Sequence, residues 1–133
     1  MAMSNPYAAY QQNSVTTASP GELTLMLYNS CLKFINLAKL AITDGNVQEK
    51  NTNLIKAQKI INELIVTLNQ DLEVSENMIV MYEYITHRLI EANVKNDQAI
   101  LDEVAEYVSD FRDTWKQVIQ LSHKHQFGQG GQT

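Results

Sequence analysis

With 133 residues, of which 44% are hydrophobic and 19% charged, the chain is long enough for one domain with a real core and too short for two ordinary ones. Fifteen acidic and ten basic residues give a net charge of −5 without a run of lysine or arginine, which argues against nucleic acid or an anionic lipid surface as the main partner. One cysteine excludes an internal disulfide, and the lack of a signal-like start and of roughly 20 uninterrupted apolar residues predicts a cytoplasmic protein without membrane insertion.

Residues 1–18 carry no charged side chain and no helical period, so we do not expect a regular helix there. They do carry Tyr7, Tyr10 and Val15, whereas a solvated tail normally has charge and few aromatic residues. We therefore predict a mobile N-terminal arm that docks on the domain part of the time through the two tyrosines. The alternative is a free terminus.

A clear helix signal begins at Ser19. Its side chain can accept from the backbone N–H of Glu22, the Glu22 side chain can reach back, and Pro20 stands where its missing donor costs nothing. The helix predicted over residues 19–42 has apolar side chains on several faces, whereas a surface helix has one apolar stripe. It is therefore either surrounded by its own protein or carries a face for a partner. The first of its stripes contains Leu27, Cys31, Phe34, Ala38 and Ala41.

Three further helices are predicted over residues 47–72, 76–92 and 97–123, with Ser75 and either Asn96 or Asp97 as caps. Each has apolar residues alternately three and four positions apart, which is typical of helices packed at a shallow angle in a bundle. These core stripes are Leu54, Ala57, Ile61, Leu64 and Leu68; Met78, Tyr82, Ile85, Leu89 and Ala92; and Leu101, Val104, Val108, Phe111, Trp115 and Val118.

Short polar links between the predicted helices imply antiparallel neighbours. We therefore expect an all-α protein, an antiparallel up-down four-helix bundle over residues 19–125. The segment 126–133 is rich in glycine and glutamine, which predicts a disordered C-terminal tail.

Few side chains are placed to carry out chemistry. No Glu-x-x-His pair is present to hold a metal as in di-metal bundles, since Glu83 and His87 are one residue too far apart. Cys31 has no histidine near it in the sequence and is predicted to lie in the core. We expect no enzyme activity, no cofactor and no metal. The alternative is a histidine phosphotransfer domain with His87 as the phosphoacceptor, although Ile90 and Glu91 flank it instead of small residues.

Apolar residues remain on helices whose core stripes are already complete. Some of this surplus fills the interior of a small bundle, but positions opposite the core stripes are harder to bury in a monomer. Those positions include Leu25, Leu32, Ile55, Val66, Val80 and Ile90. Such surfaces usually receive an amphipathic helix from a partner or from another copy. The residues alone thus predict a helical binding module.

Several motifs also resemble those of one family. They are the start Asn5-Pro6-Tyr7 with Tyr10, the segment SPGEL from Ser19, the pair Leu27-Tyr28, the stretch MYEYITHRLIEAN that ends at Asn93, and DFRDTW, which ends at Trp115. Over about residues 5–120 the chain resembles the flagellar secretion chaperone family FliS and is similar to its Bacillus member. It departs from the family at residues 73–77, EVSEN, where relatives often have a turn that contains glycine.

This resemblance implies a cytoplasmic export chaperone that binds the disordered C-terminal segment of flagellin and prevents premature polymerisation. It implies delivery of the client to the cytoplasmic domain of the flagellar type III export gate, and an N-terminal arm that covers part of the client groove. Without client, the apolar groove is a candidate surface for a homodimer. The predicted partner-binding residues are Tyr7 and Tyr10 in the arm, and Ile55, Ile65, Val66, Ile79, Val80, Ile90, Tyr107 and Leu121 on the last three helices.

Overall fold

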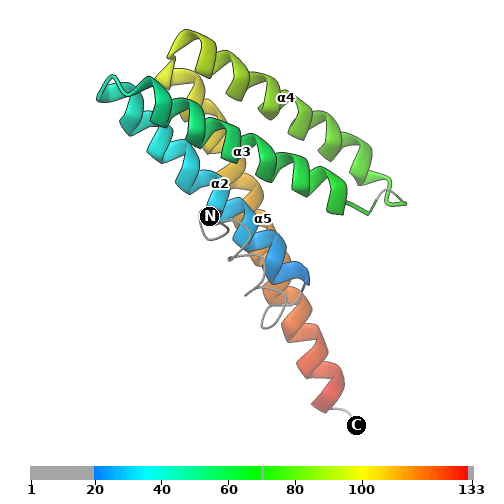
Figure 1. The fold of residues 1–133 in the computed structure, drawn as a ribbon. Coiled ribbons are helices and arrows are strands. Elements are labelled where there is room, and N and C mark those ends of the chain that lie inside the picture. The colour runs from blue at the N-terminus through cyan, green and yellow to red at the C-terminus, as the bar shows by residue number, and fades with distance from the viewer. Residues whose placement is uncertain (1–19, 70, 132–133) are drawn as a thin grey trace, which may run out of the picture.

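The computed structural model describes residues 20–69 and 71–131, with side chains over 21–69 and 71–121. Four helices make up this part of the chain, with no strand among the described residues: α2 (Pro20–Thr43), α3 (Val47–Thr67), α4 (Val74–Lys95) and α5 (Gln98–Gly131) (Figure 1). α2 packs on α3 and α5, and α4 packs on the same two helices. The predicted antiparallel four-helix bundle is confirmed. The predicted arm over residues 1–18 and the Ser19 cap lie outside the described residues.

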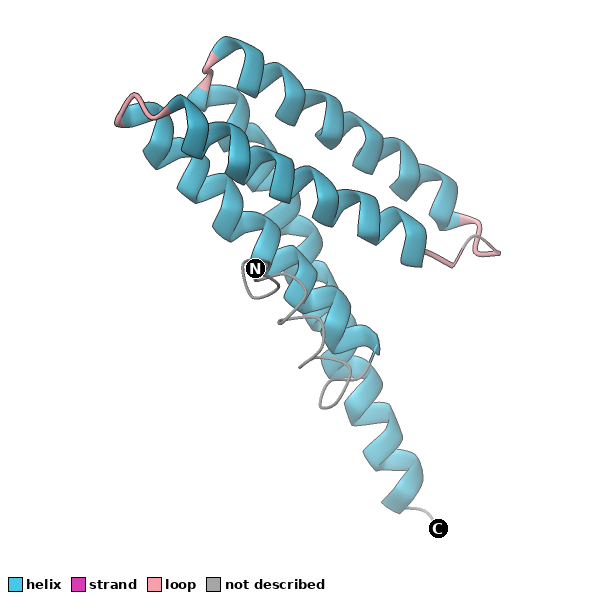
Figure 2. Ribbon diagram, in the orientation of Figure 1, coloured by secondary structure: helices cyan, strands magenta, loops and turns pink. Residues whose placement is uncertain are grey.

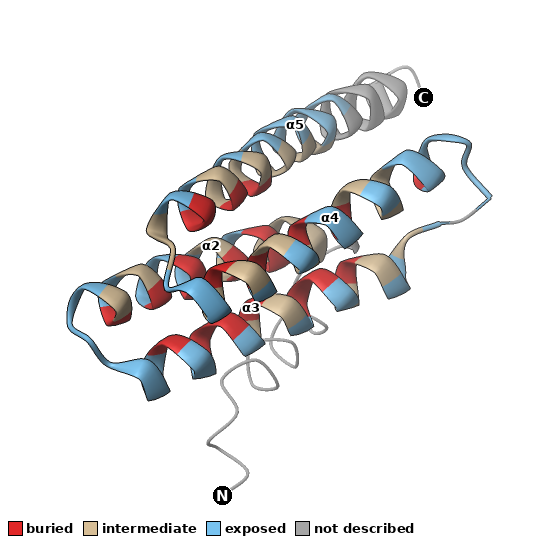
Figure 3. Ribbon diagram, turned by 90° about the horizontal axis from the view of Figure 1, so that it is seen from above, coloured by how far each residue is buried: buried red, intermediate tan, exposed pale blue. Residues whose placement is uncertain are grey.

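The buried residues, red in Figure 3, lie on the sides of the four helices that face one another. Every predicted core position from Leu27 to Ala41 is buried, and so are Leu54, Ala57, Ile61 and Leu64 on α3. Ile60, which the sequence places at the flank of its stripe, is also in the core with 1% of its surface exposed. Part of the apolar surplus expected on the first helix is therefore interior, since Tyr28 and Ile35 are buried too. The core cluster is completed by Tyr82, Ile85, Leu89, Ala92, Ile100, Leu101, Val104 and Val108.

The two short turns, between α2 and α3 and between α4 and α5, lie together at one end of the bundle (Figure 2). Gly45 takes a positive φ of 71°, which suits a residue without a Cβ, and Asn46 caps α3 by accepting from the backbone N–H of Glu49 at 3.0 Å. At the other turn Asn96 ends α4 in the left-handed region, and Asp97 caps α5 by accepting from the Ala99 N–H at 2.9 Å. The two residues proposed as alternative caps thus have different roles.

Lys50 joins these turns. Its side chain is only 5% exposed, and its ammonium group donates to the carbonyl oxygen of Asn93 at 2.8 Å and to the side-chain oxygen of Asn96. Asn93 and Asn96 belong to the last turn and the cap of α4, where a cation interacts favourably with the unpaired carbonyl groups. The buried ammonium group of Lys50 therefore links the α2–α3 turn to the α4–α5 turn through hydrogen bonds.

At the opposite end α3 stops at Thr67 instead of continuing to residue 72 as predicted. Leu68 is extended, and the Thr67 hydroxyl donates to main-chain carbonyls of its own last turn, a local bond that competes with helix continuation. Ser75 is not a cap. It lies inside α4, is 1% exposed, and its hydroxyl donates to the Asn69 carbonyl in the connection. The α3–α4 connection is thus pinned to the helix that follows it.

α5 runs past the other helices (Figure 1) and ends at Gly131, not near His123. The predicted disordered tail from residue 126 therefore begins within this helix. No proline follows Pro20, and glycine costs a helix only about 1 kcal/mol, so nothing in the sequence forces an earlier end. Val118, predicted as a core residue, is 44% exposed, because α5 has passed the end of the α3–α4 pair at that point.

Among the described residues, one stretch has the length and apolarity of a membrane span. It is Gly21–Thr43 in α2, with a mean hydropathy of 1.2 and 44% of its most apolar window buried. Glu22, Lys33 and Lys39 lie within it, so it is not the uninterrupted apolar run whose absence the sequence analysis notes. Because its apolar residues form one wall of the core, the place of α2 in the bundle accounts for its composition.

Candidate functional site

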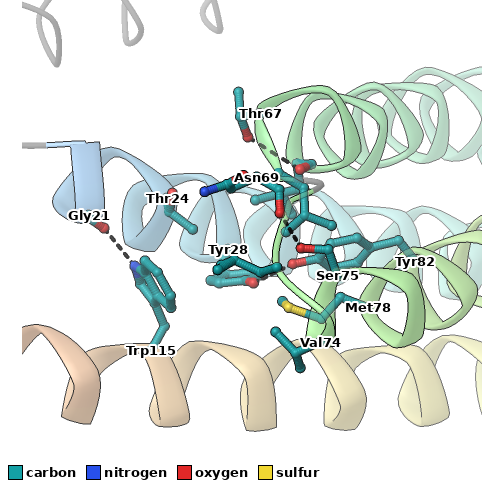
Figure 4. A pocket seen from close by; sticks show the side chains of 13 residues that line it. Gly21, Thr24, Tyr28, Thr67, Asn69, Val74, Ser75, Met78, Tyr82 and Trp115 are labelled. Atoms are coloured by element: carbon teal, nitrogen blue, oxygen red, sulfur yellow. Dashed lines mark hydrogen bonds between the residues drawn. The ribbon is translucent and has the colours of Figure 1, made fainter.

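A pocket of about 300 Å³ opens at the end of the bundle where the α3–α4 connection faces α2 and α5 (Figure 4). All four helices contribute to it, with Gly21 and Tyr28 from α2, Leu64 from α3, Tyr82 from α4 and Trp115 from α5. The rest of the wall is formed by Thr24, Thr67, Leu68, Asn69, Leu72, Val74, Ser75 and Met78. A concave, mostly apolar site with a few polar groups is the usual form of a binding pocket.

Two tyrosine hydroxyls form the inner wall of the pocket. The hydroxyls of Tyr28 and Tyr82 are 2.5 Å apart and hydrogen-bonded, and each residue is 1% exposed. The Phe111 ring stacks on Tyr28 with centroids 6.1 Å apart and lies 5.4 Å from the Tyr82 ring. Burial raises the pKa of both phenols, and the Tyr28 hydroxyl raises that of Tyr82 further. Both remain protonated, so they can position an apolar ligand but supply no charge.

Trp115 closes the pocket towards the start of α2. Its indole N–H donates to the Gly21 carbonyl at 2.8 Å, across 94 residues of sequence (Figure 4). A Cβ on Gly21 would meet the Ile119 side chain at 3.5 Å, which is ordinary contact. The approach of α2 to α5 therefore does not require a glycine at this position, and the Trp115 hydrogen bond is what holds the first turn of α2 beside the pocket.

The residues considered for catalysis do not form a reactive site. Cys31 is completely buried, its thiol faces the Ala57 carbonyl at 4.0 Å, and burial raises its pKa to about 12. His87 is exposed on α4, but the guanidinium of its neighbour Arg88 is already paired with Glu91 and Glu103. Over the part of the chain that the structure describes, no three His, Cys, Asp or Glu side chains gather to hold a metal ion.

Five of the predicted partner-binding residues share one outer face. The Asn93 amide donates to the Asn51 side chain at 2.9 Å, which identifies the flanks of α3 and α4 that face each other. At about 100° per residue, Ile55, Ile65 and Val66 point within roughly 60° of Asn51, and Ile79 and Ile90 within roughly 60° of Asn93. We call these five residues the α3–α4 seam. Ile55 is 40% exposed, Ile90 45% and Val66 67%, whereas Ile65 and Ile79 are partly buried.

The remaining predicted residues lie elsewhere. Val80 is 63% exposed but is on the flank of α4 that faces α5, as is Tyr84, one turn later. Tyr107 lies on α5 with its ring 6.0 Å from that of Tyr84, and Leu121 is 67% exposed on the part of α5 beyond the bundle. Tyr7 and Tyr10 are outside the described residues. Sequence spacing finds apolar residues off the core stripes but cannot tell which neighbouring helix each one faces.

Sequence reasoning missed the pocket. The spacing of apolar residues predicts Tyr82 and Trp115 as core positions, and both do pack in or against the core, but together with Tyr28 they also line a cavity. The concentration of large aromatic residues near one end was the available signal, whereas the end of α3 at Thr67 is known only from the structure.

Comparison with known proteins decides the family. Residues 3–122 match the family described as flagellar protein FliS. The chain belongs to the FliS family of flagellar secretion chaperones. Flagellar secretion chaperone FliS of Bacillus subtilis strain 168 is 60% identical over 131 residues, which is 98% of both chains. The FliS of Escherichia coli K12 is 35% identical over 111 residues, 81% of this chain and 82% of that protein.

The crystal structure of a flagellar chaperone from bacteria has the same fold, with a TM-score of 0.72 at 20% identity over 86% of this chain and 94% of the other. The FliS fold of this chain is thus a helical bundle with a pocket at one end and apolar side chains along one outer seam. The curated relatives have the names of chaperones, not of enzymes.

Proposed function

We propose that this protein is a cytoplasmic export chaperone that binds the disordered C-terminal segment of flagellin. In that state the segment cannot polymerise prematurely, and the complex delivers it to the cytoplasmic domain of the flagellar export gate. Family membership supports the class of function. The observation that carries the finer proposal is the apolar surface left on complete helices, namely the pocket and the exposed part of the α3–α4 seam.

A client that folds as it binds suits this surface. Ordering a flexible segment costs conformational entropy, so a broad apolar contact is needed to offset it. The seam offers exposed side chains on two adjacent ridges, Ile55 and Val66 on α3 and Ile90 on α4, into which an amphipathic helix can pack. The pocket offers space for one large apolar side chain at the end of the same bundle.

The N-terminal arm is part of this proposal. Gly21 lines the pocket, and Tyr10 is only eleven residues before it in the sequence, so at about 3.3 Å per residue its ring is within reach of any part of the pocket. An uncharged segment with two tyrosines is chemically matched to an apolar pocket. In this proposal the arm covers the client surface, and in a client-free protein without the arm a second copy takes its place.

Titration calorimetry and circular dichroism test the binding. The purified full chain and the last several dozen residues of flagellin are expected to combine at one to one with a gain in helical signal. Ile90→Glu weakens the complex, whereas Leu40→Glu, at a leucine that is 61% exposed on α2, a helix without seam residues, leaves it unchanged. Absence of heat and of added helicity at micromolar concentration discards the flagellin proposal.

The arm has a separate test. Deleting residues 1–15, or changing Tyr7 and Tyr10 together to Ala, removes the competitor and is expected to tighten client binding by roughly 5- to 150-fold. The truncated chain should also self-associate more readily in analytical ultracentrifugation. If the truncated chain binds flagellin more weakly than the full chain, the tyrosines are client contacts and the covering role is wrong.

A further inference from the structure

A second surface lies between α4 and α5, on the flank of α4 that faces away from the α3–α4 seam. We call it the acidic–aromatic surface and define it by Val80, Tyr84, Glu103, Glu106, Tyr107 and Asp110. The Tyr84 and Tyr107 rings meet edge to face, with centroids 6.0 Å apart and an interplanar angle of 80°. Tyr84 is 39% exposed and Val80 63%. Val80 and Tyr84 thus face solvent, while the Tyr107 ring beneath them is partly buried and packs against the core.

The carboxylates of this surface lie on one flank of α5. Glu103, Glu106 and Asp110 are separated by three, four and seven positions, which places the three carboxylates along one flank, with Glu103 and Asp110 within about 60° of Tyr107. Within the described residues, Glu106 and Asp110 make no hydrogen bond or ion pair. Residues 71–133 contain eleven of the fifteen acidic residues but only five of the ten basic ones. The negative charge is therefore concentrated in the half of the sequence that contains α4 and α5.

The chain itself shows which cation fits beside the tyrosines. The Arg88 Nε donates to Glu103 Oε1 at 2.8 Å and its Nη1 to Glu91 at 2.7 Å, while the Tyr84 hydroxyl donates to the other oxygen of Glu103 at 3.1 Å. Arginine is the residue that both pairs with carboxylates and stacks on aromatic rings. Glu106 and Asp110 offer the same chemistry to a guanidinium from outside.

We propose that the acidic–aromatic surface binds an arginine-bearing segment of a second protein. The uncharged residues 1–18 lack the complementary charge, and a second copy placed here by two-fold symmetry brings the same carboxylates face to face. Because the surface and the α3–α4 seam are on opposite flanks of α4, both can be occupied at once. Its existence does not depend on flagellin being the client.

The test uses the full chain labelled with ¹⁵N and a short synthetic peptide in which arginine recurs every third or fourth position on an alanine and leucine background. Amide shifts are expected to concentrate at residues 80–88 and 103–110. A matched lysine peptide, of equal charge, is expected to bind about two- to fivefold more weakly because it stacks poorly on tyrosine. Raising salt from about 50 to about 300 mM weakens both complexes, since the Debye length falls below about 10 Å.

Three variants locate the contact. Tyr84→Leu keeps apolar area but removes the aromatic face and should weaken the arginine peptide about two- to fivefold without changing the lysine peptide. Glu106→Gln with Asp110→Asn weakens both peptides about fivefold, whereas the control Asp44→Asn with Glu49→Gln, at the α2–α3 end, leaves both unchanged. Shifts scattered over the molecule, equal affinity for the two peptides, or an equal loss in the control overturn the proposal, because net charge alone then explains the binding.

Discussion

The hydrogen bond between Tyr28 and Tyr82 allows a sharp test of how the pocket wall is built. Both residues are 1% exposed, and each hydroxyl is the hydrogen-bond partner of the other. Replacing one tyrosine by Phe removes one oxygen and leaves the other hydroxyl buried without that partner. That costs about 1–3 kcal/mol, whereas replacing both removes the need for a partner and is expected to be nearly neutral.

The assay is urea denaturation of the full chain, followed by helical circular dichroism, for the two single variants and the double variant. Each single variant is expected to lower the free energy of unfolding by about 1–3 kcal/mol, which corresponds to a fall in Tm of roughly 3–10 °C for a chain of this length. The double variant should lose less than either single variant, which is a coupling that a double-mutant cycle measures.

Two results refute the reasoning. If the losses of the single variants add in the double variant, the two hydroxyls are not coupled and the contact contributes nothing of its own. If each single variant loses less than about 0.5 kcal/mol, water entering from the pocket satisfies the remaining hydroxyl, and the wall is wetter than its burial indicates.

Three further predictions test the core, the buried lysine and the thiol. Val108→Glu places a charge at a position that is 1% exposed and should unfold the bundle. Ile90→Glu, on the half-exposed seam, should leave the thermal melt almost unchanged. Equal melting temperatures for the two variants would contradict the division into core and seam. Lys50→Met removes the hydrogen bonds to Asn93 and Asn96 and should lower the free energy of unfolding by about 1–3 kcal/mol. Amide hydrogen exchange should become faster at the α4–α5 turn. Exchange that becomes faster uniformly along the chain would count against a local role of Lys50. Because burial raises the Cys31 pKa to about 12, a thiol reagent at pH 8 should label it only after urea is added, and rapid labelling of the folded chain would show that the core opens.

Helical periodicity was sufficient to predict most of the residues in the interior of the bundle. The spacing of three and four predicts Leu54, Ala57, Ile61 and Leu64 as core, because one helix face must be apolar if it is to be buried. Ile60 falls at the flank in that pattern because the pattern gives a direction for the stripe but not its width. The width depends on how closely α2 approaches α3, which is a property of two helices together.

The ends of the helices could not be predicted without knowledge of the tertiary contacts. α3 ends at Thr67, where the hydroxyl bonds to carbonyl groups of its own last turn and where the Ser75 hydroxyl donates to the Asn69 carbonyl in the connection that follows. A serine before a helical run is normally typical of a cap. Only the position of the preceding loop reveals that Ser75 is buried and donates to the Asn69 carbonyl.

The positions of the candidate surfaces also depend on tertiary contacts that the sequence pattern does not contain. Ile79 and Val80 are adjacent in sequence and equally apolar, yet they face different neighbours of α4. The bond between Asn51 and Asn93 fixes that orientation, and no single-helix pattern contains it. The pocket arises from the gap between the α3–α4 connection and α5, so it depends on the meeting of segments far apart in the chain.

The chain has one tryptophan, and it stands at the wall of the pocket with its indole N–H on Gly21. Indole emission responds to water and to hydrogen bonding at the ring, so the intrinsic fluorescence of the unmodified protein comes from the place where a ligand would enter. Filling the pocket, emptying it or pulling the start of α2 away each changes the surroundings of that single ring. The protein therefore carries its own optical probe of occupancy, readable without a label.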